Sequence, residues 1–257
     1  MIPKIIHYCW LSNDPYPDKI RKCLESWHRY LPDYKFILWN RDSFDIDSVT
    51  WTKQAFERKK YAFAADYIRL YALYNYGGIY MDMDVEVLKS FDPFLKLKTM
   101  ICFENSKQGL EMATFGVEKG AAWVKECLKY YENRSFIKAD GMLDTITLPF
   151  IIQQICLKDS YRLEPVYSIE EALQKETGNA LAILSSDYFS PKTTFRDEKI
   201  VLTSNTVSIH HFKGTWLPWY SKIEKRVSNI LGFESKDFIR AAIYKIQLEV
   251  AKRKIKK

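Results

Sequence analysis

This sequence lacks any long apolar run. Spanning a bilayer takes about 20 consecutive, mostly apolar residues, and no stretch of the 257 residues reaches that length. Residues 1–7 also lack the apolar core of a secretory signal peptide. We therefore expect a cytoplasmic protein, and only its basic tail suggests a peripheral contact with the inner face of the cell membrane.

Cysteine is sparse and unpatterned. The five cysteines are scattered without a C-x-x-C pair, at Cys9, Cys23, Cys102, Cys127 and Cys156. Zinc sites and disulfide frameworks show paired spacings that are missing here. The cysteines therefore argue against a zinc site and predict reduced thiols in a cytosol-like compartment.

Internal repeats and low-complexity linkers are also absent, and 47% of the residues are hydrophobic. A chain of this length and composition can bury a sizeable core in one domain. The net charge of +7 is unevenly distributed, because residues 213–257 hold 12 Lys and Arg against 4 Asp and Glu. We predict a catalytic domain over residues 1–220 and a basic helical extension over residues 221–257. Nucleic-acid binding needs basic residues spread across a face, and the nearly neutral remainder argues against it.

Two predicted strands open the chain, over residues 4–10 and 34–39, with a helix between them. Asp18 is predicted to cap that helix, which runs to about residue 30. This β-α-β order is typical of a nucleotide-binding α/β half. Only short strands and polar loops are predicted for residues 161–202. Further strands are predicted over residues 85–88, 99–103, 112–117 and 206–212, and further helices over residues 53–60, 121–132 and 149–158.

The sequence is organised around residues 62–87, AFAADYIRLYALYNYGGIYMDMDVEV. Asp66 and Arg69 are three residues apart and share one side of the helix predicted there. The apolar face of that helix is predicted from helical spacing and comprises Phe63, Tyr67, Leu70 and Tyr74.

Gly77 and Gly78 predict the end of the helix, because glycine readily adopts positive φ. The apolar strand 79–81 follows, and Asp82 and Asp84 come directly after it, at the edge where open α/β sheets place ligands. In extended backbone, residues i and i+2 point the same way, so both carboxylates offer hard oxygen ligands to Mg²⁺ or Mn²⁺. An acidic surface turn is the alternative, since isolated D-x-D pairs are common by chance. The preceding strand and the nearby Asp-x-x-Arg helix favour the cation site.

Trp10 and Tyr8, at the end of the first predicted strand, are candidates for nucleotide binding. Trp10 could stack on a base there or be a core aromatic, and the residues alone favour neither. His7 is expected to be a hydrogen-bonded core histidine rather than a ligand. His210 and His211 point to opposite faces of a strand, so only one of them could complete the ligands of a cation. Ordinary strand histidines are the alternative for both.

Three blocks of sequence carry a resemblance to a known family. They are A-A-D-Y-I-R-L-Y-A-L with G-G-I-Y-M-D-M-D, the amino-terminal I-P-K-I-I-H-Y-C-W, and I-H-H-F-K-G-T-W near the end. Together they resemble the DXD sugar-binding region of glycosyltransferase family 32. That family includes bacterial capsular polysaccharide transferases, which are the most similar in length, and initiating mannosyltransferases of the fungal Golgi. The glucosylating domain of the large clostridial toxins carries a similar block.

The resemblance implies a GT-A-like α/β fold with a mixed central sheet. It also implies a metal-dependent hexosyltransferase that moves a sugar from a nucleotide-sugar to a hydroxyl acceptor, with retention at the anomeric carbon. UDP is the favoured nucleotide, with GDP open, and the acceptor is a glycan or a lipid-linked glycan in capsule or surface polysaccharide synthesis. The cation, Mn²⁺ or Mg²⁺, bridges the diphosphate and offsets charge on the leaving group.

The resemblance assigns roles to four polar residues of the central stretch. Asp84 is the principal protein ligand of the cation, and Asp82 contacts the cation or the ribose. Asp66 and Arg69 hold sugar hydroxyls, with Arg69 also near phosphate. These four residues are the implied catalytic group.

The resemblance also bears on the aromatic and histidine candidates. It favours Trp10, with Tyr8 and Trp216, as nucleotide contacts. The recurring Ile-His of the family favours His210 as the histidine ligand, whereas the spacing to Trp216 leaves His211 open.

Two other classes of function compete. I-Y-M-D-M-D-V-E-V also fits haloacid-dehalogenase-type phosphatases, in which Asp82 would be the nucleophile and Asp84 the acid/base. That fold needs a downstream acidic metal pair, and this chain has no Asp-Asp or Gly-Asp dipeptide. The third class is a non-enzymatic membrane adaptor that binds anionic lipid through a basic helix over residues 235–254. A helix that packs on the domain is the alternative for that segment.

Overall fold

A computed structural model describes residues 1–104, 109–158, 160–191 and 200–212 of the chain. The chain divides into two compact units, Met1–Lys213 and Gly214–Lys257. The second unit lies outside the described residues, so the basic extension and the boundary at residue 220 stay predictions. Within the described residues, no helix has the length and hydropathy needed to cross a membrane.

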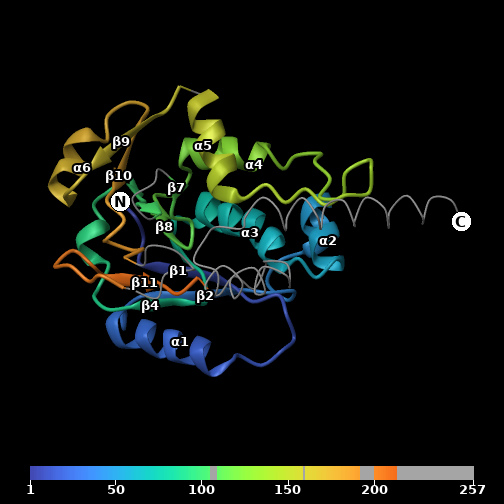
Figure 1. Ribbon diagram of the computed structural model, residues 1–257, viewed down its shortest axis with the longest axis horizontal. Helices are drawn as coiled ribbons and strands as arrows, with labels where there is room; N and C mark the ends of the chain where they lie inside the picture. Colours follow the sequence, from blue (N-terminus) through green and yellow to red (C-terminus); the bar gives the residue numbers. More distant parts are fainter. Residues whose placement is uncertain (105–108, 159, 192–199, 213–257) are drawn as a thin grey trace, which may run out of the picture. The chain divides into compact units, whose positions relative to one another are not determined.

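The first unit is built on a mixed five-stranded sheet with the strand order β2-β1-β3-β8-β5 (Figure 1). The strand β1 is parallel to both β2 and β3, whereas β8 is antiparallel to β3 and to β5. The predicted α/β class with a mixed central sheet is confirmed. The five strands are β1 (Ile5–Cys9), β2 (Lys35–Trp39), β3 (Gly78–Met81), β5 (Thr99–Met100) and β8 (Thr114–Val117).

Helices cover both faces of this sheet (Figure 1). Because successive residues of a strand point to opposite faces, β3 contributes to two cores. Ile79 and Met81 pack with Trp27 in the core on the side of α1, and Tyr80 joins the core on the side of α3. The helix α1 (Asp18–Tyr30) covers one face, and the other is covered by α2 (Thr50–Glu57), α3 (Tyr61–Tyr76) and α4 (Ala122–Lys129).

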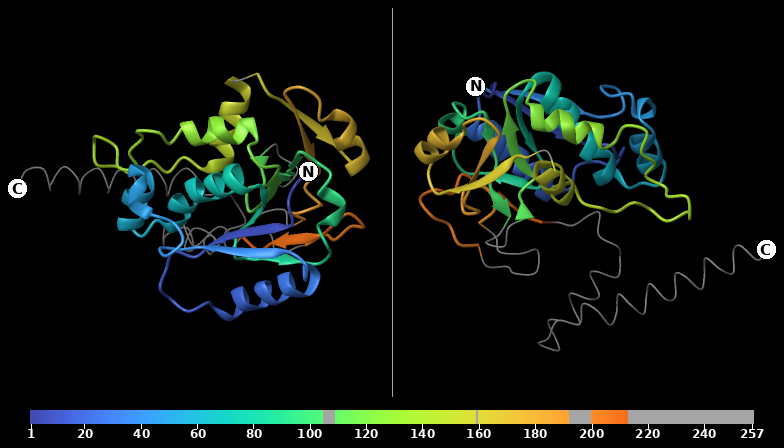
Figure 2. Two further views of the ribbon diagram at one scale, coloured as in Figure 1. Left: turned by 180° about the vertical axis from the view of Figure 1, so that it is seen from behind. Right: turned by 90° about the horizontal axis from the view of Figure 1, so that it is seen from above.

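Smaller strand pairs and helices surround the main sheet in the described part of the chain. The pairs are β4 (Val85–Val87) with β11 (Ser208–His210), β6 (Phe103–Glu104) with β7 (Gly109–Leu110), and β9 (Arg162–Val166) with β10 (Ala180–Leu184). The helices are α5 (Leu148–Lys158), α6 (Ile169–Lys175) and the 3-10 turns η1 (Ile46–Ser48) and η2 (Asp92–Phe94). Both views of Figure 2 show β9, α6 and β10 together at one end of the sheet, where β10 contacts β5.

The expectation of only strands and loops over residues 161–202 is wrong, because α6 occupies part of that stretch. The hydroxyl of Ser168 accepts the backbone N–H of Glu171 at 3.1 Å and caps this helix. The sequence carried that signal, since Ser followed by Glu three residues later is typical of a helix start.

The predicted cap at Asp18 is also wrong. The helix α1 begins at Asp18 itself, after Pro17, and no side chain caps it. The carboxylate of Asp18 instead pairs with Arg21 one turn along the helix. The helix α2 begins at Thr50, three residues before the predicted start.

The central helix α3 is confirmed, but its predicted apolar face is too narrow. The sheet, α2 and α4 all contact α3, and residues such as Ile68 and Ala72 are completely buried. Tyr67 and Tyr74, which were expected on the buried face, are only half-buried. Since α3 is enclosed on several sides, a single apolar stripe does not describe it.

Gly78 brings the start of β3 close to β1. Its φ is +106°, and a Cβ atom there would lie 2.6 Å from the carbonyl oxygen of Ile5. His7 is completely buried beside it, with Nε2 donating to the carbonyl of Gly77 at 2.8 Å and Nδ1 accepting from the indole of Trp39 at 3.1 Å. Burial lowers the pKa of His7 to about 4. The prediction of a hydrogen-bonded core histidine is confirmed. His7 of β1 connects the start of β3 to Trp39 of β2 through these two hydrogen bonds.

Candidate functional site

The carboxyl ends of three neighbouring strands meet at one edge of the sheet. The strands β2, β1 and β3 run parallel and are followed by Asn40, Trp10 and Asp82. Adjacent strands lie about 4.8 Å apart, so this edge is roughly 10 Å wide. The crevice at such an edge is where open α/β sheets bind their ligands.

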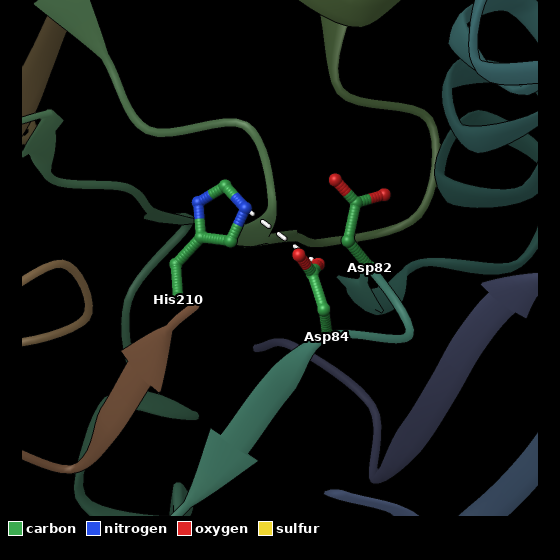
Figure 3. Close-up of side chains that lie close together, drawn as sticks. All are labelled: Asp82, Asp84 and His210. Carbon is green, nitrogen blue, oxygen red and sulfur yellow. Dashed lines mark ion pairs between the residues drawn. The ribbon is translucent and has the colours of Figure 1, made fainter. Parts of the chain in front are cut away.

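Asp82, Asp84 and His210 converge at this edge (Figure 3). One ligand atom from each residue lies within 4.8 Å of the other two. The imidazole Nε2 of His210 is 3.6 Å from Asp84 Oδ1, and this ion pair is the dashed line in Figure 3. Two carboxylate oxygens and an imidazole nitrogen can ligate a divalent cation such as Mn²⁺.

A turn, rather than extended backbone, brings the two aspartates together. The strand β3 ends at Met81 and β4 begins at Val85. Between them, the N–H of Val85 donates to the carbonyl of Asp82 at 3.1 Å, and the N–H of Asp82 donates to the carbonyl of Ala113 at 2.8 Å. The predicted extended geometry is therefore wrong, although the two carboxylates do lie together.

The pairing of β11 with β4 decides between the two histidines. His210 lies opposite Val85 in this antiparallel pair, which places it beside Asp84. His211 lies on the other side, where its Nε2 is 2.9 Å from Glu86 Oε2. The structure therefore brings His210 to the aspartates and leaves His211 with Glu86.

Acidic groups surround the imidazole of His210. Its Nδ1 is 3.2 Å from Glu111 Oε2, opposite the nitrogen that faces Asp84. Burial by itself would lower the pKa of His210, but the charge and hydrogen bond of Glu111, together with Asp84 and Asp82, raise it to about 9. A metal ligand must be deprotonated, so a proton and a cation compete for Nε2.

Arg69 forms a buried bridge behind Asp82. Its side chain is only 7% exposed, and Nη2 lies 3.3 Å from both Asp66 Oδ1 and Asp82 Oδ1. Its Nη1 donates to the carbonyl of Met112 at 2.9 Å, and the guanidinium lies 4.5 Å from the centre of the Tyr80 ring. The Tyr80 hydroxyl also donates to Asp82 Oδ1 at 3.1 Å. These contacts orient the Asp82 carboxylate from inside the protein.

The acidic pair beside Arg69 is shifted toward protonation. Burial raises the pKa of Asp66 to about 7, although the charge of Arg69 acts in the opposite direction. Burial also raises the pKa of Asp82, with Arg69 again opposing and Asp84 adding to the shift. Arg69 is thus the largest influence that opposes the rise in pKa of both acids, and His210 and Tyr80 add to it at Asp82. The predicted contacts of Asp66 and Arg69 with sugar hydroxyls and phosphate stay predictions.

Residues 111–113, between β7 and β8, contact three residues of this site. The side chain of Glu111 contacts His210, the carbonyl of Met112 accepts from Arg69, and the carbonyl of Ala113 accepts from the N–H of Asp82.

Glu111 and Glu104 are two acidic residues near this site that no sequence motif indicated. Glu111 is 2% exposed, and the signal for it was a single carboxylate between Leu110 and Met112. A charged residue inside an apolar run is rarely buried without a partner. Glu104 lies close by on β6, opposite Gly109 of β7. Burial and the charge of Glu111 raise the pKa of Glu104 to about 7.

Trp10 lines a pocket of about 690 Å³ at the ends of β1 and β2. Its indole N–H donates to the carbonyl of Asp14 at 3.0 Å, and its ring meets Tyr16 edge-on at 5.0 Å between centroids. Asn40 and Asp42 add polar groups to the lining. Pockets that bind small molecules are of this size and combine aromatic with polar groups.

Tyr8 is not among the described residues that line this pocket. Tyr8 is half-buried and packs edge-on against Trp27 of α1, with 5.4 Å between ring centroids. Trp216 lies outside the described residues. Their contacts with a nucleotide stay predictions.

One family of known proteins matches the part of the chain that forms this site. Residues 17–101 match the family described as "Glycosyltransferase sugar-binding region containing DXD motif". The matched stretch includes Asp66, Arg69, Asp82 and Asp84, and it ends before His210. The chain therefore carries a glycosyltransferase-type DXD region over residues 17–101.

Two curated relatives come from Schizosaccharomyces pombe. The chain is 34% identical to "Inositol phosphoceramide mannosyltransferase 1" over 174 residues, which are 64% of this chain and 53% of the relative. It is 31% identical to "Inositol phosphoceramide mannosyltransferase 3" over 132 residues, which are 50% of this chain and 36% of the relative. The chain thus spans between about a third and about half of the length of these relatives. The solved structure "PaToxG Glycosyltransferase" aligns with a TM-score of 0.47 and 17% identity, covering 62% of this chain and 70% of that chain.

Proposed function

We propose that this protein is a metal-dependent glycosyltransferase of GT-A-like fold that moves a hexose from a nucleotide-sugar to a hydroxyl acceptor. One observation carries the proposal. Asp82, Asp84 and His210 converge at the carboxyl edge of the parallel strands, where the pocket lined by Trp10 also lies. The match of residues 17–101 to the DXD sugar-binding region supports it.

The groups that converge fit a divalent cation. Asp82 and Asp84 offer hard oxygen ligands and His210 an imidazole nitrogen, a set that suits Mn²⁺, with Mg²⁺ as the alternative. When bound, the cation supplies positive charge that stabilises the departing nucleoside diphosphate. Arg69 keeps Asp82 oriented and disfavours its protonation, through the ion pair at 3.3 Å.

The pocket at Trp10 is proposed to hold the nucleoside. The indole offers a face for the base, and Asn40 and Asp42 offer polar groups near it. The resemblance to glycosyltransferase family 32 favours UDP and retention at the anomeric carbon. The relatives are named mannosyltransferases, so mannose and GDP-linked sugars belong among the donors to be tested.

The acceptor is proposed to be a hydroxyl of a glycan or a lipid-linked glycan. The names of the relatives give inositol phosphoceramide as one lipid of this kind. The resemblance to capsular transferases gives surface polysaccharide as the other source. Both are polyhydroxylated acceptors.

A panel of UDP-sugars and GDP-sugars, incubated without acceptor, tests the proposed reaction. We expect slow release of free sugar from one nucleotide class in Mn²⁺ or Mg²⁺, and none in EDTA. Hydrolysis that is equally fast in EDTA would contradict the metal-dependent mechanism. A panel that stays intact with and without added glycan acceptors would contradict glycosyl transfer.

The same geometry weakens the phosphatase alternative. That chemistry needs a second acidic pair beside the two aspartates, and within the described ranges the group that joins them is His210. A p-nitrophenyl phosphate assay on the same samples tests this alternative. Turnover that depends on Asp82 would restore it.

Trp10→Ala is expected to weaken nucleotide binding by roughly 1–3 kcal/mol, or about 5–150-fold in Kd, because an aromatic face stacked on a base contributes that much. Isothermal titration with UDP and GDP measures it. Tyr167→Ala is the matched control, since that aromatic residue is 73% exposed and lies between β9 and α6, outside the pocket lining. Unchanged affinity in folded Trp10→Ala would make Trp10 a packing residue only.

The basic residues of the tail are proposed to bind anionic membrane. Each basic residue near an anionic surface contributes about 1 kcal/mol, or roughly fivefold in affinity. Replacing the three basic residues 252–254 by Gln is expected to reduce co-sedimentation with phosphatidylserine vesicles at low salt. The matched control replaces the three basic residues 58–60. Equal binding by the two variants, or binding that high salt does not screen, would contradict the proposal.

A further inference from the structure

Glu111 contacts His210 on the side away from the proposed cation site. Its Oε2 is 3.2 Å from His210 Nδ1, and its Oε1 accepts the backbone N–H of Ala113 at 2.7 Å. Glu111 is 2% exposed. Because imidazole is a stronger base than a carboxylate, the proton between the two groups belongs to His210, and the Glu111 carboxylate is an acceptor at both oxygens.

An ionised carboxylate accepts hydrogen bonds and donates none. The proton between Glu111 and His210 must therefore be on Nδ1. In neutral imidazole only one nitrogen carries a proton, so the lone pair is then on Nε2. That nitrogen faces Asp84 at 3.6 Å. Glu111 thus determines which nitrogen of His210 can act as a ligand.

Glu111 is itself held in place. The backbone N–H of Glu111 donates to the carbonyl of Cys102 at 2.9 Å, and the next two residues hold Arg69 and Asp82 through their carbonyl groups. Any shift of this segment would move His210 and Asp82 together. A buried carboxylate at this point therefore couples the histidine to the aspartates.

We propose that Glu111 is the positioning residue of the metal centre, which selects the Nδ1–H form of His210 and aims Nε2 at the cation. The inference rests on the proposed metal site and names a residue outside the matched DXD region. Partners that orient a metal-bound histidine typically contribute 10–100-fold to metal affinity. Glu111 acts through His210 and does not touch the cation itself.

The test compares Glu111→Gln with Glu111→Ala. In Glu111→Gln the amide oxygen is expected to stay on the N–H of Ala113, which turns the NH₂ group toward His210 Nδ1. That donor favours the wrong form of His210, with the proton on Nε2. We expect Mn²⁺ affinity, measured on the full chain by electron paramagnetic resonance of free Mn²⁺, to fall about 10–100-fold in Glu111→Gln.

In Glu111→Ala no side chain at residue 111 favours either protonated nitrogen of His210, and the lost side chain leaves a cavity. We expect its Mn²⁺ affinity to fall less than that of Glu111→Gln, while its melting temperature falls more. A merely structural role would give the same ranking for both measurements. The opposite ranking of affinity and stability is therefore the signature of positioning, and Glu111→Gln alone tests the loss of affinity where Glu111→Ala does not fold.

A second carboxylate–histidine pair, next to His210 in the chain, supplies a matched control. Glu86 and His211 form a carboxylate–histidine pair at 2.9 Å, directed away from the aspartates. Glu86→Gln is expected to leave Mn²⁺ affinity unchanged. An equal loss in Glu86→Gln and Glu111→Gln would show a general effect of charge and would overturn the proposal.

His210→Ala separates this inference from the proposed function. If it lowers Mn²⁺ affinity while Glu111→Gln does not, the metal site stands and the positioning role is overturned. If the wild-type protein binds no Mn²⁺, the metal site and the positioning role are both overturned. Loss of affinity in His210→Ala and Glu111→Gln, with none in Glu86→Gln, supports both.

Discussion

Asp84→Asn is expected to abolish donor hydrolysis and sugar transfer while the protein stays folded. An amide retains the shape of the side chain but not the negative charge that binds a cation. Replacing a residue that only orients a metal ligand costs 10–100-fold, so removing a direct ligand is expected to cost at least about 100-fold in activity. Hydrolysis of the donor identified by the nucleotide-sugar panel, in Mn²⁺, is the measurement.

The folded state of this variant is an independent check. Asp84 raises the pKa of Asp82 by its like charge and pairs with His210 at 3.6 Å, so neutralising Asp84 removes one repulsion and one attraction. We therefore expect the melting temperature to stay close to that of the wild type. Glu86→Gln, two residues away and paired with His211, is the control and should keep its activity. Full activity of folded Asp84→Asn, or of the wild type in excess EDTA, would exclude the metal assignment.

Asp82 and Asp84 could be predicted as a site because the sequence signals for them are local. Gly77 ends α3 with a φ of 65°, β3 is short and buried, and Asp82 follows directly. The geometry between Asp82 and Asp84 could not be predicted, since it depends on where the chain goes next. The strand β4 leaves the main sheet to pair with β11, and the turn that makes this possible replaces the expected extended backbone.

The histidine could be predicted only as one of two neighbours. Alternation along a strand says that His210 and His211 face opposite ways, and nothing in the local sequence says which way is inward. The choice depends on the register of β11 against β4, in which Ile209 lies opposite Glu86. That register joins segments more than 100 residues apart in the chain, beyond the reach of local spacing.

Two Asp-x-x-Arg pairs also show that local spacing does not predict which residues form the site. Asp18 and Arg21 have the spacing of Asp66 and Arg69, and both pairs form ion pairs. Exposed fractions separate them, at 84% and 55% for the first pair and 11% and 7% for the second. Burial depends on what packs over a helix, so only the tertiary structure distinguishes the pair at the site from the pair at the surface.

Arg69→Lys is the second large effect we expect. One guanidinium contacts Asp66 and Asp82, both at 3.3 Å, and the carbonyl of Met112 at 2.9 Å. A lysine ammonium is a point charge and does not reproduce this planar arrangement of donors. Hydrogen bonds to charged groups contribute about 1.5–3 kcal/mol each, so the loss of one predicts roughly a 10–150-fold decrease in kcat/KM at pH 7.

The pH profile of Arg69→Lys distinguishes positioning from loss of fold. Arg69 lowers the pKa of both Asp66 and Asp82 against the effect of burial, so weakening its contacts raises both values. More of Asp82 is then protonated at neutral pH, and activity should recover in part as the pH rises. Arg21→Lys makes the same chemical change in an exposed pair and is expected to have little effect, because surface ion pairs contribute little. Normal kinetics in Arg69→Lys at every pH would mean that the buried guanidinium does not orient Asp82. A uniform loss of activity with a lower melting temperature and no change in pH profile would assign Arg69 to folding alone.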